Sequence, residues 1–401
     1  MPFTLLAHKN FRSYFIADII ASIGSGIIFI GMNWFIMSST GTNAAVGKLL
    51  SVSLIGGILI FPFAGVITDR FSRLAVLKWI LIVRSVSVFL AAISIPLGFF
   101  SNLMLYMVMF IAGTGWSVFL SSSRGLMQEL LAPEDFIKGS SLIEISLQCG
   151  MFTAAALGGF LFKYLGLQTL FYLSIATYLL SYSFLRRVSY TPHIAEDKNE
   201  VWFTQLKNSW GYFKENQMIF LLCIVLFIPF VVTMVSNVVL PGYVKTHIGG
   251  DSVIYGFADM SYGIGACLSG LVASRIASFL HEKGSIYAFF ILSICAISFL
   301  IFNKWIAGLF VGSLCYGIGN SSIRILLNTI MMRIVPKSFM GRSMSAWLSI
   351  SLLMQITLAF VMGKTIDIIP VAHGFTILAI IMIAALIATI QIAKRLDLNK
   401  Q

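Results

Sequence analysis

The stretch Gly65-Val66-Ile67-Thr68-Asp69-Arg70-Phe71-Ser72-Arg73 ends a long apolar segment with a cluster of charges. A shorter copy, Gly270-Leu271-Val272-Ala273-Ser274-Arg275, begins 205 positions later and also ends an apolar segment. A single Gly-x-x-x-x-Arg match would be weak evidence of anything. Because the pattern recurs in the same context, we expect the chain to consist of two similar halves.

The composition is that of a membrane protein. Of the 401 residues, 58% are hydrophobic and only 10% are charged, whereas soluble domains carry roughly 25% charged residues. The net charge of +12 does not indicate nucleic-acid binding, because the basic residues form short clusters between apolar runs. The five cysteines lie inside apolar runs without metal-ligand spacing, so we expect no metal site.

A helix needs about 20 apolar residues to cross a bilayer, and the sequence predicts twelve such segments. They lie near 12–37, 46–66, 75–97, 102–122, 140–163, 168–185, 217–241, 253–275, 285–302, 305–327, 345–368 and 373–393.

A long polar stretch, 186–216, divides these segments into two sets of six. We therefore expect an N-terminal half (1–185), a linker with a short surface helix near 202–213, and a C-terminal half (217–401). Pro133 and Pro336 follow the fourth and tenth segments, 203 positions apart, which supports a duplication.

The distribution of Lys and Arg predicts the orientation in the membrane. With a cytoplasmic N-terminus, 20 of the 27 basic residues fall inside, 5 fall outside, and Arg84 and Arg324 lie within spans. We therefore expect a multi-pass protein of the cell membrane with both termini and the linker in the cytoplasm.

Gly65, Asp69, Arg70 and Arg73 resemble the signature G-x-x-x-D-R-x-x-R of the major facilitator superfamily of transporters. The resemblance implies an all-α membrane fold of two six-helix repeats, related as parallel repeats, and a monomer. In this family Asp69 would contact the N-terminus of the helix at 345–368, where the helix dipole attracts a carboxylate, and so hold a cytoplasmic gate closed. Ser274 replaces the aspartate in the second copy, so its gate contact should be weaker.

Two further resemblances concern direction and branch. Gly150, Gly158 and Gly159 match the family's exporter motif G-x-x-x-G-P-x-x-G-G, with Ala154-Ala155 in place of Gly-Pro. The surrounding pattern, including Asn10-Phe11-Arg12 and Gln128-Glu129-Leu130, resembles the branch of macrolide-efflux proteins and the enterobactin exporter. Some bacterial exporters of metallophores of the staphylopine type are similar in kind.

Ionisable residues inside a span are rare, and each is a candidate for function. Asp18, Glu144 and Asp259 are the candidates for proton coupling, because a buried carboxylate can load and release a proton. A structural ion pair or a surface charge is the alternative for each of them.

The candidates for substrate binding are one cation and several polar or aromatic residues in the spans. Arg324 could pair with a substrate carboxylate, or instead with an internal acid. The others are Trp116, Asn237, Asn320 and Gln355.

The sequence shows no enzyme constellation, no ATP-binding Walker motif and no cofactor site. We therefore expect a proton gradient to drive transport of a small molecule. The favoured hypothesis is a proton-coupled exporter of a metallophore, such as a siderophore or opine-type chelator. The alternatives are macrolide or multidrug efflux, nutrient uptake, and a membrane sensor that transports nothing.

Overall fold

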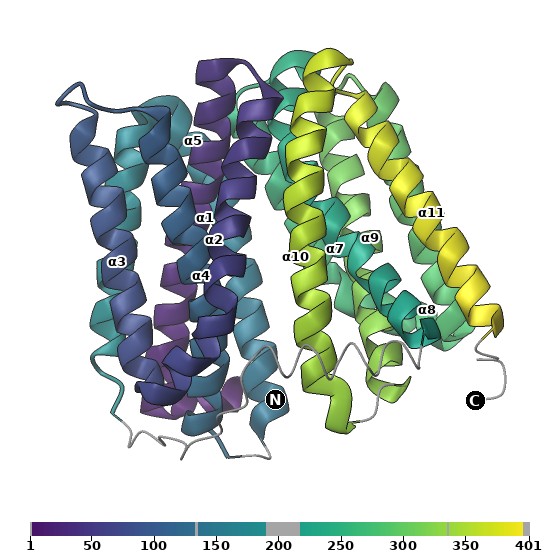
Figure 1. The fold of residues 1–401 in the computed structure, drawn as a ribbon, viewed down its shortest axis with the longest axis horizontal. Coiled ribbons are helices and arrows are strands. Elements are labelled where there is room, and N and C mark those ends of the chain that lie inside the picture. Colours follow the sequence, from purple (N-terminus) through teal and green to yellow (C-terminus); the bar gives the residue numbers. More distant parts are fainter. Residues whose placement is uncertain (1, 133–134, 190–216, 335–336, 396–401) are drawn as a thin grey trace. The chain divides into compact units, whose positions relative to one another are not determined.

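A computed structural model describes residues 2–132, 135–189, 217–334 and 337–395. The described elements are helices throughout (Figure 1). In chain order they are η1 (Pro2–Ala7), α1 (Lys9–Thr40), α2 (Asn43–Arg70), α3 (Arg73–Ser94), α4 (Asn102–Leu130), α5 (Phe136–Leu185), α7 (Gln217–Gly242), the π-helical η3 (Tyr243–Ile248), α8 (Ser252–Phe302), α9 (Ile306–Ile334), α10 (Lys337–Ile368) and α11 (His373–Arg395).

Each of the twelve predicted segments corresponds to a helix or to part of one. Ten helices of the described chain are long and apolar enough to cross a membrane, and a bent pair within α8 would make an eleventh. The helix α5 holds two predicted segments and breaks at Gly166, where φ is 73°. The helix α8 also holds two and breaks at His281, where φ is 57°. The predicted all-helical membrane fold is confirmed, while the surface helix expected near 202–213 lies outside the described residues.

The chain divides into two compact units. Unit 1 comprises Met1–Gly41, Lys48–Lys198 and Asp251–Met260, and unit 2 comprises Thr42–Gly47, Asn199–Gly250 and Ser261–Gln401. The first turns of α2 therefore pack with unit 2, and the first turns of α8 pack with unit 1. The expected division of the chain at the 186–216 linker stays a prediction, because most of that segment lies outside the described residues.

In unit 1, α1 and α5 approach each other through small side chains. A Cβ added to Gly150 would lie 2.5 Å from Cβ of Ser22, and one added to Gly26 would lie 2.5 Å from Cβ of Ala154. Both distances are shorter than any normal carbon–carbon contact, so larger residues would push the helices apart. The small face that resembles the exporter motif is thus a helix-packing surface.

An adjacent face of α5 packs closely against the start of α8. The Ser252 hydroxyl donates a hydrogen bond to the carbonyl oxygen of Gly159 at 2.7 Å, and a Cβ on Gly159 would lie 2.2 Å from the Ser252 carbonyl oxygen. Just outside, Lys163 Nζ and Asp251 Oδ2 form an ion pair at 2.7 Å. Asp251 also accepts hydrogen bonds from the amides of Val253 and Ile254 at 3.0 and 3.1 Å. These contacts fix the beginning of α8 against unit 1.

The pKa of Asp251 reflects these contacts. Burial alone would raise the pKa of its carboxyl, but the hydrogen bonds and charge of Lys163 and the two α8 amides lower it below the ordinary value. Asp251 is therefore an anion at the N-terminus of α8, where the helix dipole favours negative charge.

Unit 2 binds the beginning of α2 in a similar way. Asp367, at the end of α10, accepts hydrogen bonds from the amide of Asn43 at 2.6 Å, the side chain of Asn43 at 3.0 Å and the amide of Ala44 at 2.9 Å. One turn further along α2, a Cβ on Gly47 would lie 2.4 Å from the carbonyl oxygen of Ala359. A carboxylate and a glycine contact again hold a helix N-terminus in place.

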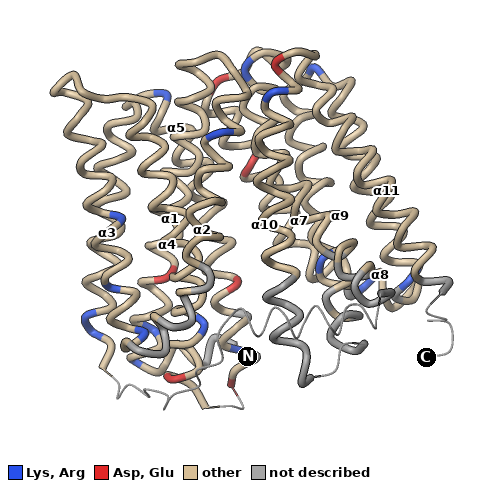
Figure 2. Tube along the Cα trace, viewed as in Figure 1, with Lys and Arg blue, Asp and Glu red and all other residues tan. Residues whose placement is uncertain are grey.

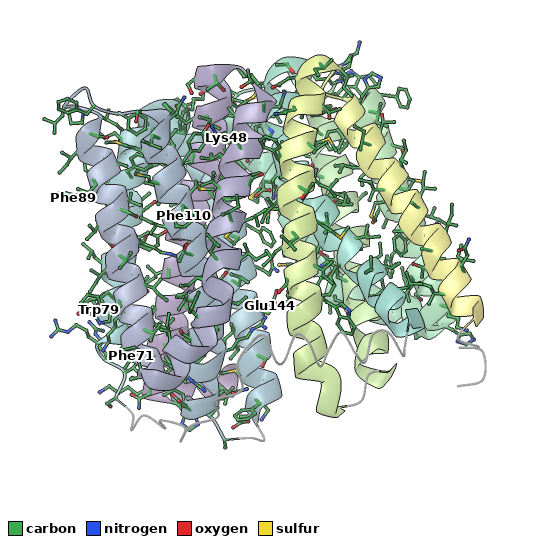
Figure 3. The ribbon with its side chains drawn as sticks, viewed as in Figure 1. Lys48, Phe71, Trp79, Phe89, Phe110 and Glu144 are labelled. Atoms are coloured by element: carbon green, nitrogen blue, oxygen red, sulfur yellow. The ribbon has the colours of Figure 1, made fainter. Side chains whose placement is uncertain are left out.

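Apolar side chains cover the outer surfaces of the helices. On α3, Trp79 and Phe89 lie along the outer edge (Figure 3) and are 65% and 47% exposed. Charged residues gather towards the helix ends (Figure 2). This is the distribution that a surrounding hydrocarbon layer requires, because lipid tails cannot solvate charge.

Candidate functional site

Asp18 lies inside unit 1, where α1, α4 and α5 meet, and its side chain is 3% exposed. Ser123 of α4 donates a hydrogen bond to Oδ1 at 3.1 Å, and Ser146 of α5 donates one to Oδ2. The Tyr14 hydroxyl, one turn earlier on α1, donates to the carbonyl oxygen of Ser123 at 3.0 Å. Three helices thus position one carboxylate.

The partners of Asp18 are neutral. No ion pair to it is found among the described residues. The buried arginine of the same unit, Arg84, instead donates hydrogen bonds to Ser25 and to the carbonyl oxygen of Ala112, both at 3.1 Å. A charge at membrane depth without a counter-ion is costly, so a carboxyl group held this way is suited to taking up and releasing a proton.

The other two acids differ in environment. Glu144, labelled in Figure 3, is exposed, and it accepts a hydrogen bond at 2.8 Å from Gln148 on its own helix. Asp259 of α8 is half-buried, and within the described part of the chain its carboxylate has neither a hydrogen bond nor an ion pair. It follows Tyr255 by one helical turn, and that tyrosine stacks on Trp34 of α1.

In unit 2 a cationic site forms between α7 and α9. The Arg324 guanidinium lies over the ring of Phe230, 4.9 Å from its centre. Arg324 is half-buried, and no carboxylate of the described residues pairs with it. Asp367, a described acid of the same unit, is bound to Asn43 instead. The guanidinium therefore has donors left for a ligand.

A polar network stands one turn from Arg324 on α9. Asn320 is fully buried and donates hydrogen bonds to Thr233 Oγ1 at 2.6 Å and to the Tyr262 hydroxyl at 3.1 Å. The ring of Tyr262 lies 5.2 Å from that of Tyr316. The side-chain oxygen Oδ1 of Asn320 has no hydrogen-bond partner among the described residues. Residues 316, 320 and 324 share one face of α9 because they are four apart, so the site offers a cation, hydroxyls and a free acceptor together.

Comparison with known proteins identifies the family. The model of the Major Facilitator Superfamily matches residues 14–356. The chain belongs to this superfamily. No curated protein sequence matches it. The prediction of a membrane transporter rather than an enzyme is thereby confirmed, and so is the prediction of a small-molecule substrate.

Solved structures of two other transporters share the fold. The nucleoside transporter NupG matches with a TM-score of 0.77 and 15% identity, over 96% of this chain and 99% of that chain. A bacterial homologue of the iron transporter ferroportin, in an inward-facing state, matches with a TM-score of 0.73 and 16% identity, over 97% and 98%. At these identities the likeness shows the fold alone. The likeness to these two structures does not favour the macrolide or metallophore branch that the sequence resembles.

The remaining substrate candidates are scattered. Trp116 is half-buried on α4 of unit 1, and Asn237 is half-buried on α7, one turn after Thr233. Gln355 is fully buried on α10 and donates a hydrogen bond to Ser351 of its own helix at 3.0 Å. Of the five predicted residues, the structure brings Arg324 and Asn320 together on one face, while no described contact joins Trp116, Asn237 or Gln355 to them.

The gating motif of this transporter is only partly described. The side chains of Gly65, Asp69 and Arg70 lie outside the described residues, so the contact expected for Asp69 stays a prediction. Arg73 forms an ion pair at 3.5 Å with Glu129 near the end of α4. In the second copy, a Cβ on Gly270 would meet no atom of the described residues within 4 Å, so none of those residues makes there the close helix contact found at other glycines.

The sequence did not predict several residues that contact Asp18 and Asn320. Ser123 and Ser146 contact Asp18 from other helices, and Thr233 and Tyr262 contact Asn320 in the same way. Hydroxyl residues are common in membrane helices, so nothing distinguishes these four by type. The available signal was position: 316, 320 and 324 repeat every four residues, which places Tyr316 beside the predicted Asn320 and Arg324.

Proposed function

We propose that this transporter exports a small anionic metabolite in exchange for protons, and that a carboxylate-bearing chelator of the metallophore type is its cargo. The observation that carries the proposal is Arg324, a half-buried guanidinium that no described carboxylate neutralises. Guanidinium groups bind carboxylates in a two-pronged geometry. The neighbouring Asn320 oxygen can accept a hydrogen bond from a hydroxyl or amine of the same ligand.

Asp18 is the proposed proton carrier. Its carboxyl group is bound by two serine hydroxyls and by no cation among the described residues. A hydroxyl can donate to the ionised form and can accept from the protonated form, because it is both donor and acceptor. The same three helices can thus hold Asp18 in either protonation state. Glu144 is exposed, so it does not need hydroxyl partners to hold it in either protonation state.

Export is the proposed direction because of the small-residue face of α5. Its resemblance to the exporter motif is what supports export, and its close contacts with α1 and α8 show that the face retains a packing role without the Gly-Pro pair. Efflux of macrolides or other drugs is the second candidate. The ring of Phe230 against Arg324 and the ring of Tyr316, two turns earlier on the same face of α9 and paired with that of Tyr262, favour it, because aromatic rings could bind a large apolar ligand.

Transport in proteoliposomes tests both parts of the proposal, the anionic substrate and the coupling to protons. The purified protein is reconstituted with a pH-sensitive dye inside, and carboxylate chelators, a macrolide and a nucleoside are added in turn. A chelator should move protons, whereas neutral solutes should not. Arg324→Gln should reduce chelator transport by about ten-fold or more, since a charge-assisted pair is lost. Arg187→Gln is the matched control, because Arg187 also lies 4.9 Å over a phenylalanine ring but is exposed.

Asp18→Asn separates coupling from binding. It should abolish proton movement while labelled-substrate exchange without a pH gradient continues, and Glu144→Gln should leave both intact. Proton movement that survives in Asp18→Asn would move the coupling role to another residue. If Arg324→Gln transported anionic and neutral solutes as fast as wild type does, the proposal that the substrate is anionic would be refuted.

A further inference from the structure

We propose that Asn33, Trp34, Tyr255 and Asp259 form a subsite for a positively charged nitrogen, the ammonium group of the transported solute. This inference extends the proposed function, since it makes the cargo a molecule with both a carboxylate and an amine. All four residues belong to unit 1, because the first turns of α8 pack with that unit.

Tyr255 and Asp259 present an aromatic ring and a carboxylate side by side. They stand one turn apart on α8, and the Tyr255 ring stacks on Trp34 with centres 5.6 Å apart and planes at 22°. Both rings are buried, at 0% and 6% exposure. A carboxylate beside aromatic rings is a combination that binds ammonium groups, through charge, hydrogen bonding and cation–π attraction.

Two buried polar groups at this pair lack partners among the described residues, namely the side-chain amide of Asn33 and the hydroxyl of Tyr255 itself. Asn33 is fully buried and lies beside the Tyr255 hydroxyl. Neither the Asn33 amide nor that hydroxyl completes a hydrogen bond of normal geometry with the described residues. Buried amides and hydroxyls nearly always have partners. The Asn33 oxygen and the Tyr255 oxygen can each accept an N–H, which an ammonium group supplies.

The carboxylate of Asp259 is also unmatched. It is half-buried, and within the described chain no lysine or arginine pairs with it. Lys163, a cation at the same end of α8, is paired with Asp251. Unlike Asp18, whose oxygens are bound by serine hydroxyls, Asp259 has both oxygens free of such partners among the described residues, so they can pair with an ammonium group that a ligand supplies. No group of three or more His, Cys, Asp or Glu that could hold a metal ion occurs among the described residues, which favours an organic cation.

The subsite is held rigidly. The hydrogen bond from Ser252 to Gly159 and the backbone contact between Gly159 and Gly256 fix the turns of α8 that carry Tyr255 and Asp259. A site whose side chains are already in place loses less entropy when a ligand binds. The glycine face of α5 therefore also serves to position this subsite.

Binding of ethylammonium to the full-length protein in lipid nanodiscs tests the inference. Tryptophan fluorescence is titrated with ethylammonium chloride and, separately, with NaCl. Ethylammonium should give a saturable change, and Asp259→Asn should weaken it about ten-fold or more because the charge is lost. Glu144→Gln is the matched control, since it neutralises another acid of the same unit, one that is exposed and accepts a hydrogen bond from Gln148 of its own helix, and it should bind as wild type does.

Tyr255→Phe keeps the ring stack and removes one acceptor, so it should weaken binding several-fold while the protein stays folded. This variant carries the test if Asp259→Asn does not fold. Equal affinity in wild type, Asp259→Asn and Tyr255→Phe would overturn the proposal. Saturation by NaCl alone would also overturn it, in favour of an inorganic coupling ion.

The titration uses no pH gradient and no anionic solute. Its result therefore stands whether or not Asp18 carries protons and whether or not Arg324 binds carboxylates.

Discussion

Replacing Asp367 by alanine should loosen the beginning of α2 without unfolding the rest of the chain. The Asp367 carboxylate satisfies the amides of Asn43 and Ala44 and the side chain of Asn43. The first amides of a helix have no partner within the helix, so these contacts replace the missing ones. Asp367 is exposed, and water would take over part of the interaction after the substitution.

The expected magnitude follows from these contacts. Loss of a capping side chain costs about 0.5–2 kcal/mol, and loss of a charge at a helix N-terminus costs about 0.3–1 kcal/mol at an exposed position. Because the two effects overlap, we expect about 1–2 kcal/mol in total. At 1.4 kcal/mol per ten-fold, hydrogen exchange of the first amides of α2 should accelerate by roughly five- to thirty-fold.

Hydrogen exchange followed by mass spectrometry, on peptides that cover the starts of α2 and α4, measures this effect. Asp367→Asn should give a smaller acceleration, because an amide oxygen can still accept one bond. Ser101→Ala is the control, since Ser101 stands at the N-terminus of α4 but makes no capping hydrogen bond. Exchange at Asn43 and Ala44 that changes by less than about two-fold would refute the capping role.

Three further predictions concern contacts of unit 1. Gly159→Val should lower the melting temperature, since overpacking costs about 1–3 kcal/mol. The control is Gly270→Ala in unit 2, where the added Cβ would meet no atom of the described residues within 4 Å, and it should leave the melting temperature equal or higher. A double-mutant cycle on Arg73 and Glu129 should give a coupling of about 0.2–1 kcal/mol, and zero coupling would show that the 3.5 Å pair contributes nothing. The contribution of Asp251 to the stability of the fold should be complete above pH about 4 and be lost as the pH falls through its lowered pKa. Asp251→Asn should therefore reduce the melting temperature at neutral pH and not at pH about 2. An equal reduction at both pH values would contradict the charge argument.

The helices were predictable because span length and hydrophobicity depend only on local sequence. The break at Gly166 falls in the gap between two predicted segments, and glycine tolerates its positive φ. The break at His281 also falls in a predicted gap, but a histidine in the sequence does not predict a φ of 57°. Local composition therefore located both breaks without predicting their geometry.

The contacts of the candidate sites were not predictable, because they depend on how each helix is rotated. Asp18 is separated from Ser123 by 105 residues and from Ser146 by 128. Sequence alone identified Asp18 as an ionisable residue within a span, but it could not show that α1, α4 and α5 bury this side chain together. The assignment of the first turns of α8 to unit 1 was equally hidden.

Asp18 and Asp259 are two acids of one unit with different surroundings, and the difference suggests different tasks. The oxygens of Asp18 are occupied by hydroxyls from two other helices, so there is room for a proton and little else. Asp259 has free oxygens beside an aromatic pair and an unsatisfied amide, which suits a group that brings its own hydrogen-bond donors. If each acid does what its surroundings permit, neutralising Asp18 should uncouple transport from protons at unchanged affinity. Neutralising Asp259 should instead lower the affinity for solutes with an amine and leave proton coupling intact.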